Sequence, residues 1–362
     1  MKILEDGNIK KIKCAVLGCT GIVGQRFIKL LENHPYFKLS QIIASDKNKD
    51  KIYECAVNWL IEGEIPYYAK KLKIKIFDIK LLKEDNIKVI FCALPSNIAL
   101  KIEKILLENG FAVFSNSKAN RYKKNVPILI PEVNSSHINL IKSQNSKNKG
   151  FIITNANCST TGLAIALKPL EKFKIKNVFV STYQALSGAG YPGIASLDIN
   201  SNVIPFIEGE EEKIEIELKK ILGKLNKNII SNKKLKIVTN CARVPVRDGH
   251  LESVVIEFEK DIDIKLIKNA FTRLSSIKNL PTSPKKPIIF IEKENRPQPL
   301  IDAYTGKPKR ARGMSVTVGR LKKQGKWICF WLVVHNTIRG AAGNSILNAE
   351  YAFKKGFLNE VT

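Results

Sequence analysis

The stretch KIKCAVLGCTGIVGQRF, residues 11–27, sets the architecture of the first part of the chain. Its first eight residues form an apolar run rich in β-forming side chains, and helical periodicity follows as far as Pro35. Between them lies a loop with glycines at Gly18, Gly21 and Gly24. Such glycines let backbone N–H groups and a helix N-terminus approach a pyrophosphate. The spacing is GxxGxxG, not GxGxxG, so the strand–turn–helix context favours a dinucleotide site over a plain tight turn.

Strand and helix patterns alternate after this loop. Residues 38–45, 88–95, 111–116 and 126–134 have strand-like patterns, and residues 97–110 have helical periodicity. This alternation predicts a doubly wound, Rossmann-type parallel sheet.

Beyond residue 158 the pattern changes to strands with few helices between them. The strand-like segments are NVFVSTYQAL, KIVTNCARVPV, LESVVIEFE, KPIIFIE, MSVTVGRLKK and WICFWLVV. They predict a second α+β domain with a mostly antiparallel sheet, and residues 208–222 and the final NSILNAEYAFKKGF are predicted helices. A length of 362 residues also favours two domains, which we place at 1–157 and 158–336.

Composition narrows the class of protein. The longest apolar run, 327–334, is too short to span a membrane, and the N-terminus lacks the apolar core of a signal peptide, so we expect a cytoplasmic protein without a membrane partner. The net charge of +27 raises the alternative of a nucleic-acid-binding protein, but the lysines are scattered and no nucleic-acid-binding motif is present. Seven cysteines without a CxxC pair and four scattered histidines argue against a metal site.

The type of nicotinamide cofactor depends on the residues after the second predicted strand. Asp46 stands where an acid would hold the ribose 2′-hydroxyl of NAD. Ser45, with Lys47, Lys49 and Lys51 close behind, suits a 2′-phosphate. The basic neighbours favour NADP over NAD.

TNANCSTTG, residues 154–162, places Cys158 between a predicted strand and a helix that we expect to begin at Ser159. Partial positive charge at a helix start lowers the pKa of a thiol, and Asn157 with nearby backbone N–H groups is able to hold an oxyanion. Most cysteines are inert core residues. Polar residues on both sides make Cys158 a poor core filler, so we interpret it as a nucleophile.

A nucleophile needs a base, and CARVPVRDGHL (241–251) supplies His250. General acid–base chemistry and an ordinary turn position are equally good interpretations of this histidine. Arg243 fits a bidentate carboxylate clamp or a surface ion pair. Gln184 heads the glycine-rich loop QALSGAGYPG, which either admits a nicotinamide ring or forms a simple turn.

Taken together and in order, these motifs resemble the aspartate-β-semialdehyde dehydrogenase family, specifically its archaeal and fungal branch. The matching blocks are GCTGIVGQRF, IIASDKNKDKIYECAVNW, ALPSNIA, SNSKANRY, IPEVN, TNANCSTTGLA, QALSGAGYPG, EGEEEK, RVPVRDGH, RPQP, MSVTVGRL and HNTIRGAAGNSILNAE. They cover nearly the whole chain. Departures are small: Ala156 replaces a usual proline, Cys19 a common alanine and Asn344 a common glycine.

The resemblance implies a function and a set of roles. The function is NADPH-dependent reductive dephosphorylation of 4-phospho-L-aspartate to L-aspartate 4-semialdehyde, in amino-acid biosynthesis. Cys158 would be the nucleophile, His250 the acid/base, and Gln184 would position the thiohemiacetal. The implied substrate contacts are Arg243 for the carboxylate, Glu210 for the ammonium group, and Arg121 and Lys213 for the phosphate. The implied cofactor contacts are Gly18, Thr20, Gly21, Ile22, Val23, Ser45, Leu94, Ser187, Gly188 and Asn336.

The resemblance also implies a homodimer or a dimer of dimers, and a C-terminal helix from about residue 337 that returns to the cofactor domain. Malonyl-CoA reductase and, more distantly, N-acetyl-γ-glutamyl-phosphate reductase share the scaffold, the thiol and the nicotinamide. Glu210 and Arg243 favour an amino-acid substrate, because they match both of its charged ends.

Overall fold

The computed structural model describes residues 11–144 and 148–359, so the predictions for residues 1–10 and for the middle of the polar turn at 143–150 lie outside the described residues. The chain divides into two compact units. Unit 1 comprises Met1–Pro127, Ile138–Asn155 and Ser345–Thr362, and unit 2 comprises Ile128–His137 and Ala156–Asn344. The predicted division places its boundaries at residues 157 and 337, and it assigns 128–137 to the first domain.

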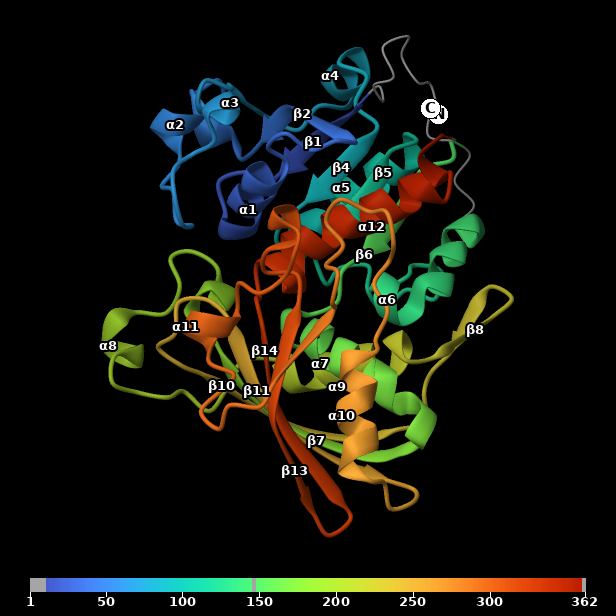
Figure 1. Cartoon of the computed structure of the whole chain (residues 1–362). Helices are drawn as coiled ribbons and strands as arrows, with labels where there is room; N and C mark the ends of the chain where they lie inside the picture. Colours follow the sequence, from blue (N-terminus) through green and yellow to red (C-terminus); the bar gives the residue numbers. More distant parts are fainter. Residues whose placement is uncertain (1–10, 145–147, 360–362) are drawn as a thin grey trace. The chain divides into compact units, whose positions relative to one another are not determined.

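Unit 1 is built on a sheet with the strand order β3-β2-β1-β4-β5-β6, in which neighbouring strands pair in parallel. The strand order reverses direction between β1 and β4, as in doubly wound dinucleotide folds. This confirms the predicted Rossmann-type sheet (Figure 1, blue to green). The strands are β1 (Ile12–Leu17), β2 (Phe37–Ile43), β3 (Ile74–Lys75), β4 (Val89–Cys92), β5 (Ala112–Ser115) and β6 (Phe151–Thr154).

Helices connect these strands. The helices of unit 1 are α1 (Ile22–Leu30), α2 (Tyr53–Ala56), α3 (Tyr67–Lys70), α4 (Ile79–Glu84), α5 (Ser96–Glu108) and the greater part of α12 (Gly343–Lys354). The last of these is the C-terminal helix, and its return to unit 1 begins at Ser345. Buried His34 holds it there, because Nε2 of His34 lies 2.9 Å from Oε1 of Glu350.

Glycines shape the loop between β1 and α1. Gly18 has a φ of +81°, a backbone conformation that residues with a Cβ rarely adopt. A Cβ at Gly24 would lie 2.1 Å from the carbonyl oxygen of Gly18, so only glycine fits where α1 packs closely on the loop. The sequence pattern therefore has two separate steric causes, a turn at Gly18 and a close approach at Gly24.

The prediction of a strand over residues 126–134 is wrong. Residues Pro131–Asn134 form the short helix α6, which begins with proline at its first position. The apolar side chains of Ile128 and Ile130 pack in the core of unit 2. The run is apolar because its side chains are buried just before and within a short helix, and not because it forms a strand of a sheet. The two-residue strand β3 is a further difference, since the sequence analysis assigned no strand there.

Two polar contacts fix this segment within unit 2. The carboxylate of Glu132 accepts hydrogen bonds of 2.9 and 2.7 Å from the guanidinium of Arg339, and both side chains are fully buried. The side-chain amide of Asn344 donates to the carbonyl oxygen of Leu129 at 2.9 Å. Paired buried charges of this kind are expensive to separate, which explains why the segment stays with unit 2.

Unit 2 contains a mixed sheet with the strand order β10-β7-β11-β14-β13-β12. Its inner strands pair antiparallel, which confirms the predicted class, whereas the edge strands β10 and β12 pair in parallel with their neighbours. The strands are β7 (Ile175–Gln184), β10 (Lys236–Arg243), β11 (His250–Phe258), β12 (Ile288–Ile291), β13 (Val316–Gln324) and β14 (Trp327–Val334). A separate hairpin comprises β8 (Lys224–Asn226) and β9 (Ile229–Ser231).

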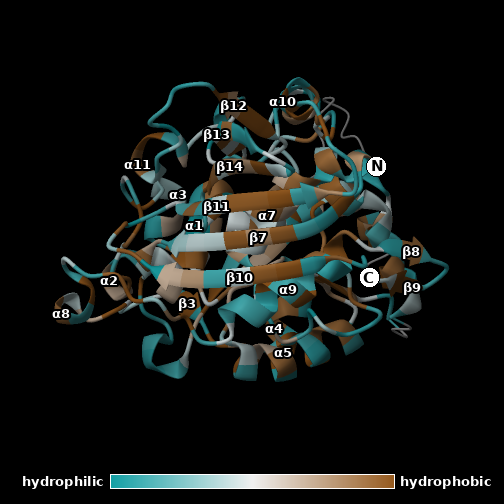
Figure 2. Cartoon of the chain, turned by 90° about the horizontal axis from the view of Figure 1, so that it is seen from below, coloured by the Kyte–Doolittle hydropathy of each residue, from teal (hydrophilic) through white to brown (hydrophobic). Residues whose placement is uncertain are grey.

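Helices α7 and α9 cover one face of this sheet (Figure 2, seen behind β7, β10 and β11). Residues 159–167 of α7 are all buried, as expected for a helix that is apolar on every side and lies within a core. The opposite face of the sheet is only half-buried. Besides α6, the helices of unit 2 are α7 (Cys158–Leu167), α8 (Ser196–Ile199), α9 (Glu210–Ile221), α10 (Ile264–Thr272) and α11 (Pro299–Asp302).

Candidate active site

The thiol of Cys158 lies at the first position of α7, one residue earlier than the predicted helix start. The side chain of Asn157 caps this helix, since its Oδ1 accepts the backbone N–H groups of Ser159 and Thr160 at 3.0 and 3.2 Å. A Cβ at Gly340 would lie 2.6 Å from the Cβ of Cys158, so the chain packs closely against the cysteine. The sulfur is therefore fixed at the positive end of a ten-residue helix, where a thiolate is favoured.

The imidazole of His250 meets this sulfur from the start of β11. Its Nε2 lies 3.0 Å from Sγ of Cys158, and its Nδ1 accepts the backbone N–H of Ala185 at 3.0 Å. Burial, followed by the positive charge of Arg243, lowers the pKa of His250 to about 3. The ring is thus neutral over the physiological range, and it contacts the thiol directly.

Arg243, at the end of β10, brings a positive charge to the site. Its Nη1 donates to the carbonyl oxygen of Ala185 at 2.8 Å, whereas its buried Nε has no hydrogen-bond partner among the described residues. A Cβ at Gly188 would lie 2.9 Å from Nη1 of Arg243 and 3.1 Å from Cε1 of His250. A side chain at position 188 would crowd both groups, so glycine there keeps the space between them open. The incompletely paired guanidinium is suited to an anionic ligand.

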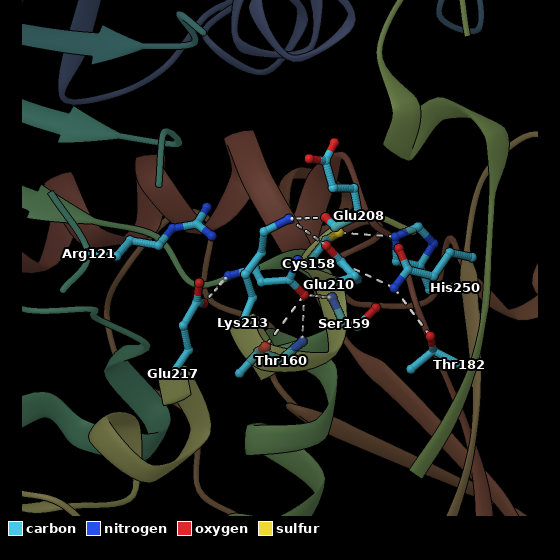
Figure 3. A network of polar contacts seen from close by, with 12 residues as sticks. Arg121, Cys158, Ser159, Thr160, Thr182, Glu208, Glu210, Lys213, Glu217 and His250 are labelled. Atoms are coloured by element: carbon cyan, nitrogen blue, oxygen red, sulfur yellow. Dashed lines mark hydrogen bonds and ion pairs between the residues drawn. The ribbon is translucent and has the colours of Figure 1, made fainter. Parts of the chain in front are cut away.

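Glu210, at the start of α9, is the anion of the site. One carboxylate oxygen accepts the side-chain amides of Asn157 at 2.6 Å and Gln184 at 3.1 Å, and the other accepts Nζ of Lys213 at 3.1 Å. Burial acts to raise the pKa of Glu210, but Lys213 and these hydrogen bonds outweigh it and lower the pKa. Figure 3 shows His250 and the pair of Glu210 and Lys213 gathered around the sulfur of Cys158.

Glu217 of α9, which was not predicted as a site residue, positions the loop that carries the cysteine. Its Oε2 accepts the backbone N–H of Asn157 at 2.5 Å, and the side chain is fully buried. A usable signal exists in the sequence: Glu210 and Glu217 are seven residues apart and share the apolar stripe of α9 with Ile214. A carboxylate within an apolar helix stripe predicts a buried, functional acid.

Glu252 was also missed. It follows His250 by two residues on β11, and the strand register places it opposite Thr182 of β7 and Leu332 of β14. Both carboxyl oxygens are buried and have no hydrogen-bond partner in the described part of the chain. Burial, and secondarily the charge of Glu210, raises the pKa of Glu252 well above the usual carboxyl range. A neutral carboxylic acid therefore lies on β11 two residues beyond His250.

The cofactor candidates of unit 1 follow the carboxyl ends of its central strands. Gly18 follows β1, Ser45 follows β2 and Leu94 follows β4. The helix α1 begins after Gly21, and the first turn of α1 has no acidic side chain. A Cβ built at Gly21 would meet only the Gly18 carbonyl oxygen, at 3.7 Å. The edge is open and free of negative charge at the helix start, so these residues fit a dinucleotide phosphate. Thr20, Ile22 and Val23 belong to the same loop and helix start.

The remaining predicted residues fall into both units. In unit 2, Nδ2 of Asn336 donates to Oγ of Ser187 at 2.7 Å, and Oδ1 of Asn336 accepts the backbone N–H of Gly249. In unit 1, Nη2 of Arg121 donates to the carbonyl oxygen of Asn116 at 2.9 Å. The structure thus brings Cys158, Asn157, Gln184, Ser187, Gly188, Glu210, Lys213, Arg243, His250 and Asn336 into unit 2, and it places Arg121 with the loop residues in unit 1.

The other cysteines differ from one another in burial. The core positions are Cys14, Cys19, Cys92 and Cys241. Cys55 is exposed and Cys329 is half-buried, so Cys158 is not the only cysteine outside the core. Over residues 11–144 and 148–359, no group of three or more histidine, cysteine or acidic side chains is placed to hold a metal ion.

Comparison with known families covers both units. Residues 13–141 match the family model described as "Semialdehyde dehydrogenase, NAD binding domain". Residues 167–339 match the model described as "Semialdehyde dehydrogenase, dimerisation domain".

Individual relatives span nearly the full length. An aspartate-semialdehyde dehydrogenase from Archaeoglobus fulgidus is 47% identical over 344 residues, covering 94% of this chain and 97% of that protein. A malonyl CoA reductase (NADP) from Metallosphaera sedula is 37% identical, covering 97% and 99%. The crystal structure of aspartate semialdehyde dehydrogenase with NADP from Candida albicans matches with a TM-score of 0.85 at 35% identity, covering 96% of this chain and 100% of that chain. The similarity is therefore not confined to one unit.

Proposed function

The chain belongs to the aspartate-semialdehyde dehydrogenase family, and we propose that it converts 4-phospho-L-aspartate to L-aspartate 4-semialdehyde with NADPH, releasing phosphate. This reaction is a step of amino-acid biosynthesis that leads toward lysine, threonine and methionine. The observation that carries the proposal is the 3.0 Å contact between Sγ of Cys158 and Nε2 of His250 at the N-terminus of α7. It places a nucleophilic thiol in direct contact with an imidazole nitrogen.

The proposed route is covalent. The Cys158 thiolate attacks the acyl carbon, the carbon–oxygen bond to phosphate breaks, and a thioester remains on the enzyme. NADPH, when bound, supplies the hydride that reduces this thioester. The resulting alkoxide re-forms its carbonyl and expels the thiolate, which releases the aldehyde. Nε2 of His250 lies close enough to the sulfur to donate a hydrogen bond to the thiolate and to deliver a proton as the aldehyde leaves.

Both charged ends of an amino-acid substrate have a partner in unit 2. The incompletely paired guanidinium of Arg243 suits the substrate carboxylate, and the ionised carboxylate of Glu210 suits the ammonium group. In the structure the ammonium group of Lys213 is paired with the carboxylate of Glu210. We propose that the incoming ammonium group replaces it, which would free Lys213 for the phosphate, with Arg121 as the other phosphate ligand implied by the resemblance.

NADP is the cofactor of this reaction. The NAD binding domain match covers the glycine loop, and the related Candida albicans structure contains NADP. In this chain Ser45 directly precedes the short helical segment Asp46–Asn48 just after β2 and makes no side-chain capping bond to it, and Lys47 and Lys49 are adjacent. We propose that this segment binds the 2′-phosphate, and that Ser187, Gly188 and Asn336 are the cofactor contacts of unit 2.

The face of the unit 2 sheet opposite α7 and α9 supports a homodimer. Tyr183 and Trp331 stack on it with ring centroids 5.8 Å apart, and Phe179 meets Trp327 edge to face at 5.5 Å. All four side chains are only half-buried, so two aromatic pairs are partly exposed on this face. Figure 2 shows the strands β7, β10 and β11 of this sheet in front of α7 and α9. We propose that two copies associate through this face as a dimer, or as a dimer of dimers.

The proposal involves no nucleic-acid or membrane partner and places the enzyme in the cytoplasm. Free cysteines at all seven positions suit a reducing compartment. In the part of the chain that the structure describes, no helix combines the length and apolar character needed to cross a bilayer. Salt-dependent RNA or DNA binding without NADPH oxidation would favour the nucleic-acid alternative instead.

The test is the reverse reaction with the purified protein. Aspartate semialdehyde, phosphate and NADP are mixed, and the absorbance of the reduced cofactor is followed. We expect cofactor reduction that requires all three reactants. A parallel assay with malonyl-CoA and NADPH examines the alternative suggested by the Metallosphaera sedula relative; activity with malonyl-CoA and none with aspartate semialdehyde would refute the proposal.

A further inference from the structure

One buried backbone residue, Ala185, contacts both His250 and Arg243. Its N–H donates to Nδ1 of His250 at 3.0 Å, and its carbonyl oxygen accepts Nη1 of Arg243 at 2.8 Å. The residue follows β7 and is itself fully buried. Backbone hydrogen bonds from Leu186 and Ser187 to the carbonyl oxygens at positions 246 and 247 hold the next residues in place. The contact geometry is therefore part of the sheet end and does not depend on a mobile side chain.

This geometry determines where the imidazole carries its proton. A nitrogen that accepts a backbone N–H has no proton of its own, so the single proton of the neutral ring lies on Nε2. That proton points along the 3.0 Å contact to Sγ of Cys158. Protonating Nδ1 as well would set two N–H groups against each other. Burial and Arg243 lower the pKa of His250, which also keeps the ring neutral.

A thiolate at Cys158 then needs a counter-charge other than an imidazolium. The charged or titratable side chains around it include His250 from β11, Arg243 from β10, and Glu210 with Lys213 from α9. Glu210 is an anion, and Lys213 is already paired with it at 3.1 Å. A Cβ at Gly188 would lie 2.9 Å from Nη1 of Arg243 and 3.4 Å from Nε2 of His250, so the guanidinium lies next to the imidazole nitrogen that contacts the sulfur. Burial lowers the pKa of Arg243, and the charges of Cys158 and Glu210 oppose that change, in agreement with this proximity.

We propose that the resting enzyme contains no thiolate–imidazolium pair: the Ala185 peptide holds His250 as the neutral Nε2–H tautomer, and Arg243 supplies the positive charge that stabilises the Cys158 thiolate. Arg243 thus acts on the nucleophile before any substrate is bound, in addition to its proposed contact with the substrate carboxylate. The inference rests on the proposed function only in taking Cys158 as the nucleophile.

The first test examines the tautomer. The protein is labelled with ¹⁵N-histidine, and its four histidines are examined by long-range ¹H–¹⁵N correlation at neutral pH, with the spectrum of His250→Asn used to identify the signal of residue 250. We expect a protonated Nε2 and an unprotonated Nδ1. A ring protonated at both nitrogens, or at Nδ1 alone, overturns the proposal.

The second test examines the charge without using turnover. Alkylation of Cys158 by iodoacetamide is measured against pH by peptide mass analysis, so that exposed Cys55 and half-buried Cys329 do not contribute. In Arg243→Gln we expect the midpoint to rise by about one pH unit or more, because a nearby opposite charge shifts a pKa by roughly 1–3 units. In Arg243→Lys, which keeps the charge, we expect a midpoint close to that of the wild-type protein.

Each other outcome is decisive as well. An unchanged midpoint in Arg243→Gln, or an equal rise in both variants, overturns the role of the charge. NADP binding and circular dichroism of each variant establish that it is folded. Failure of the proposed function is separate: a protein that shows the expected tautomer and midpoints but no aspartate-semialdehyde oxidation refutes the reaction and leaves this inference standing.

Discussion

Sγ of Cys158 lies 3.0 Å from Nε2 of His250, although the two residues are 92 positions apart in the chain. The contact forms because α7 packs against β11 and places its first residue beside the first residue of that strand. The sulfur is half-buried and therefore accessible to a small substrate. A thiol placed at a helix start, with a neutral imidazole in contact, has the geometry that covalent acyl transfer requires.

Replacing Cys158 should abolish turnover and leave the cofactor site intact. In Cys158→Ser and Cys158→Ala the attacking sulfur is lost, while the proposed nucleotide loop is in unit 1 and is unchanged. The measurements are the rate of NADP reduction and NADP affinity by fluorescence. The exposed Cys55→Ser variant is the matched control and should retain wild-type kinetics. A Cys158→Ala enzyme with most of its rate would remove this residue from the mechanism.

Replacing Arg243 by leucine should lower kcat/KM for aspartate semialdehyde roughly a hundredfold, which corresponds to a loss of about 3 kcal/mol of transition-state stabilisation. The reason is that the substrate carboxylate loses its buried, charged partner. Arg247, on the loop before β11, has a mostly exposed side chain and gives the control variant Arg247→Leu, for which we expect near-normal kinetics. Steady-state assays over a range of aldehyde concentrations measure the effect. Unaltered kcat/KM in Arg243→Leu would place the substrate carboxylate elsewhere.

Asn157 has a structural role that we expect to detect in stability. Asn157→Ala loses the cap of α7 and one donor to Glu210, so the free energy of unfolding should fall by at least about 1 kcal/mol. Asn157→Ser keeps a capping oxygen and loses the amide, and it should retain part of that stability. Urea unfolding of the two variants separates the cap from the amide. Equal losses would show that the cap contributes little.

Glu252 should make the protein less stable as pH rises. Its pKa in the folded state is raised by burial, so above the ordinary carboxyl pKa the unfolded chain releases a proton that the folded chain keeps. Stability then falls with rising pH, by up to about 1.4 kcal/mol per pH unit, until the folded pKa is reached. Glu252→Gln removes this titration, so its stability relative to the wild-type protein should increase between pH 5 and pH 8.

The control for this pH effect is Glu259→Gln, an exposed position just beyond the same strand. Urea midpoints at several pH values give both comparisons. If Glu252→Gln and the wild-type protein lose stability in parallel as pH rises, Glu252 is not a protonated acid in the folded state. We expect parallel curves only for Glu259→Gln.

The open aromatic face should determine the oligomeric state. Trp331→Glu places a carboxylate beside Tyr183 in the middle of that face, where desolvating it would oppose association. Light scattering should then give the mass of a monomer. Leu266→Glu, on the exposed side of α10, is the control and should leave the mass unchanged. A dimeric Trp331→Glu protein would exclude this face as the interface.

The sequence by itself determined the elements and the type of chemistry. The apolar run, glycine loop and helical pattern of residues 11–27 predict β1, its turn and α1, because periodicity and glycine sterics are local properties. The polar setting of Cys158 identified the candidate nucleophile for the same reason. Local patterns failed at residues 126–134, where apolar side chains enter the core of unit 2 without forming a strand.

Only the tertiary structure decided which of these groups act on one another. That His250 accepts a backbone N–H and meets the sulfur, and that Glu217 holds the backbone of Asn157, depend on sheet register and helix packing between distant segments. The protonation of Glu252 depends on burial, which no residue type specifies alone. Charge states and proton positions are set by desolvation and neighbouring groups, and both exist only once the chain has folded.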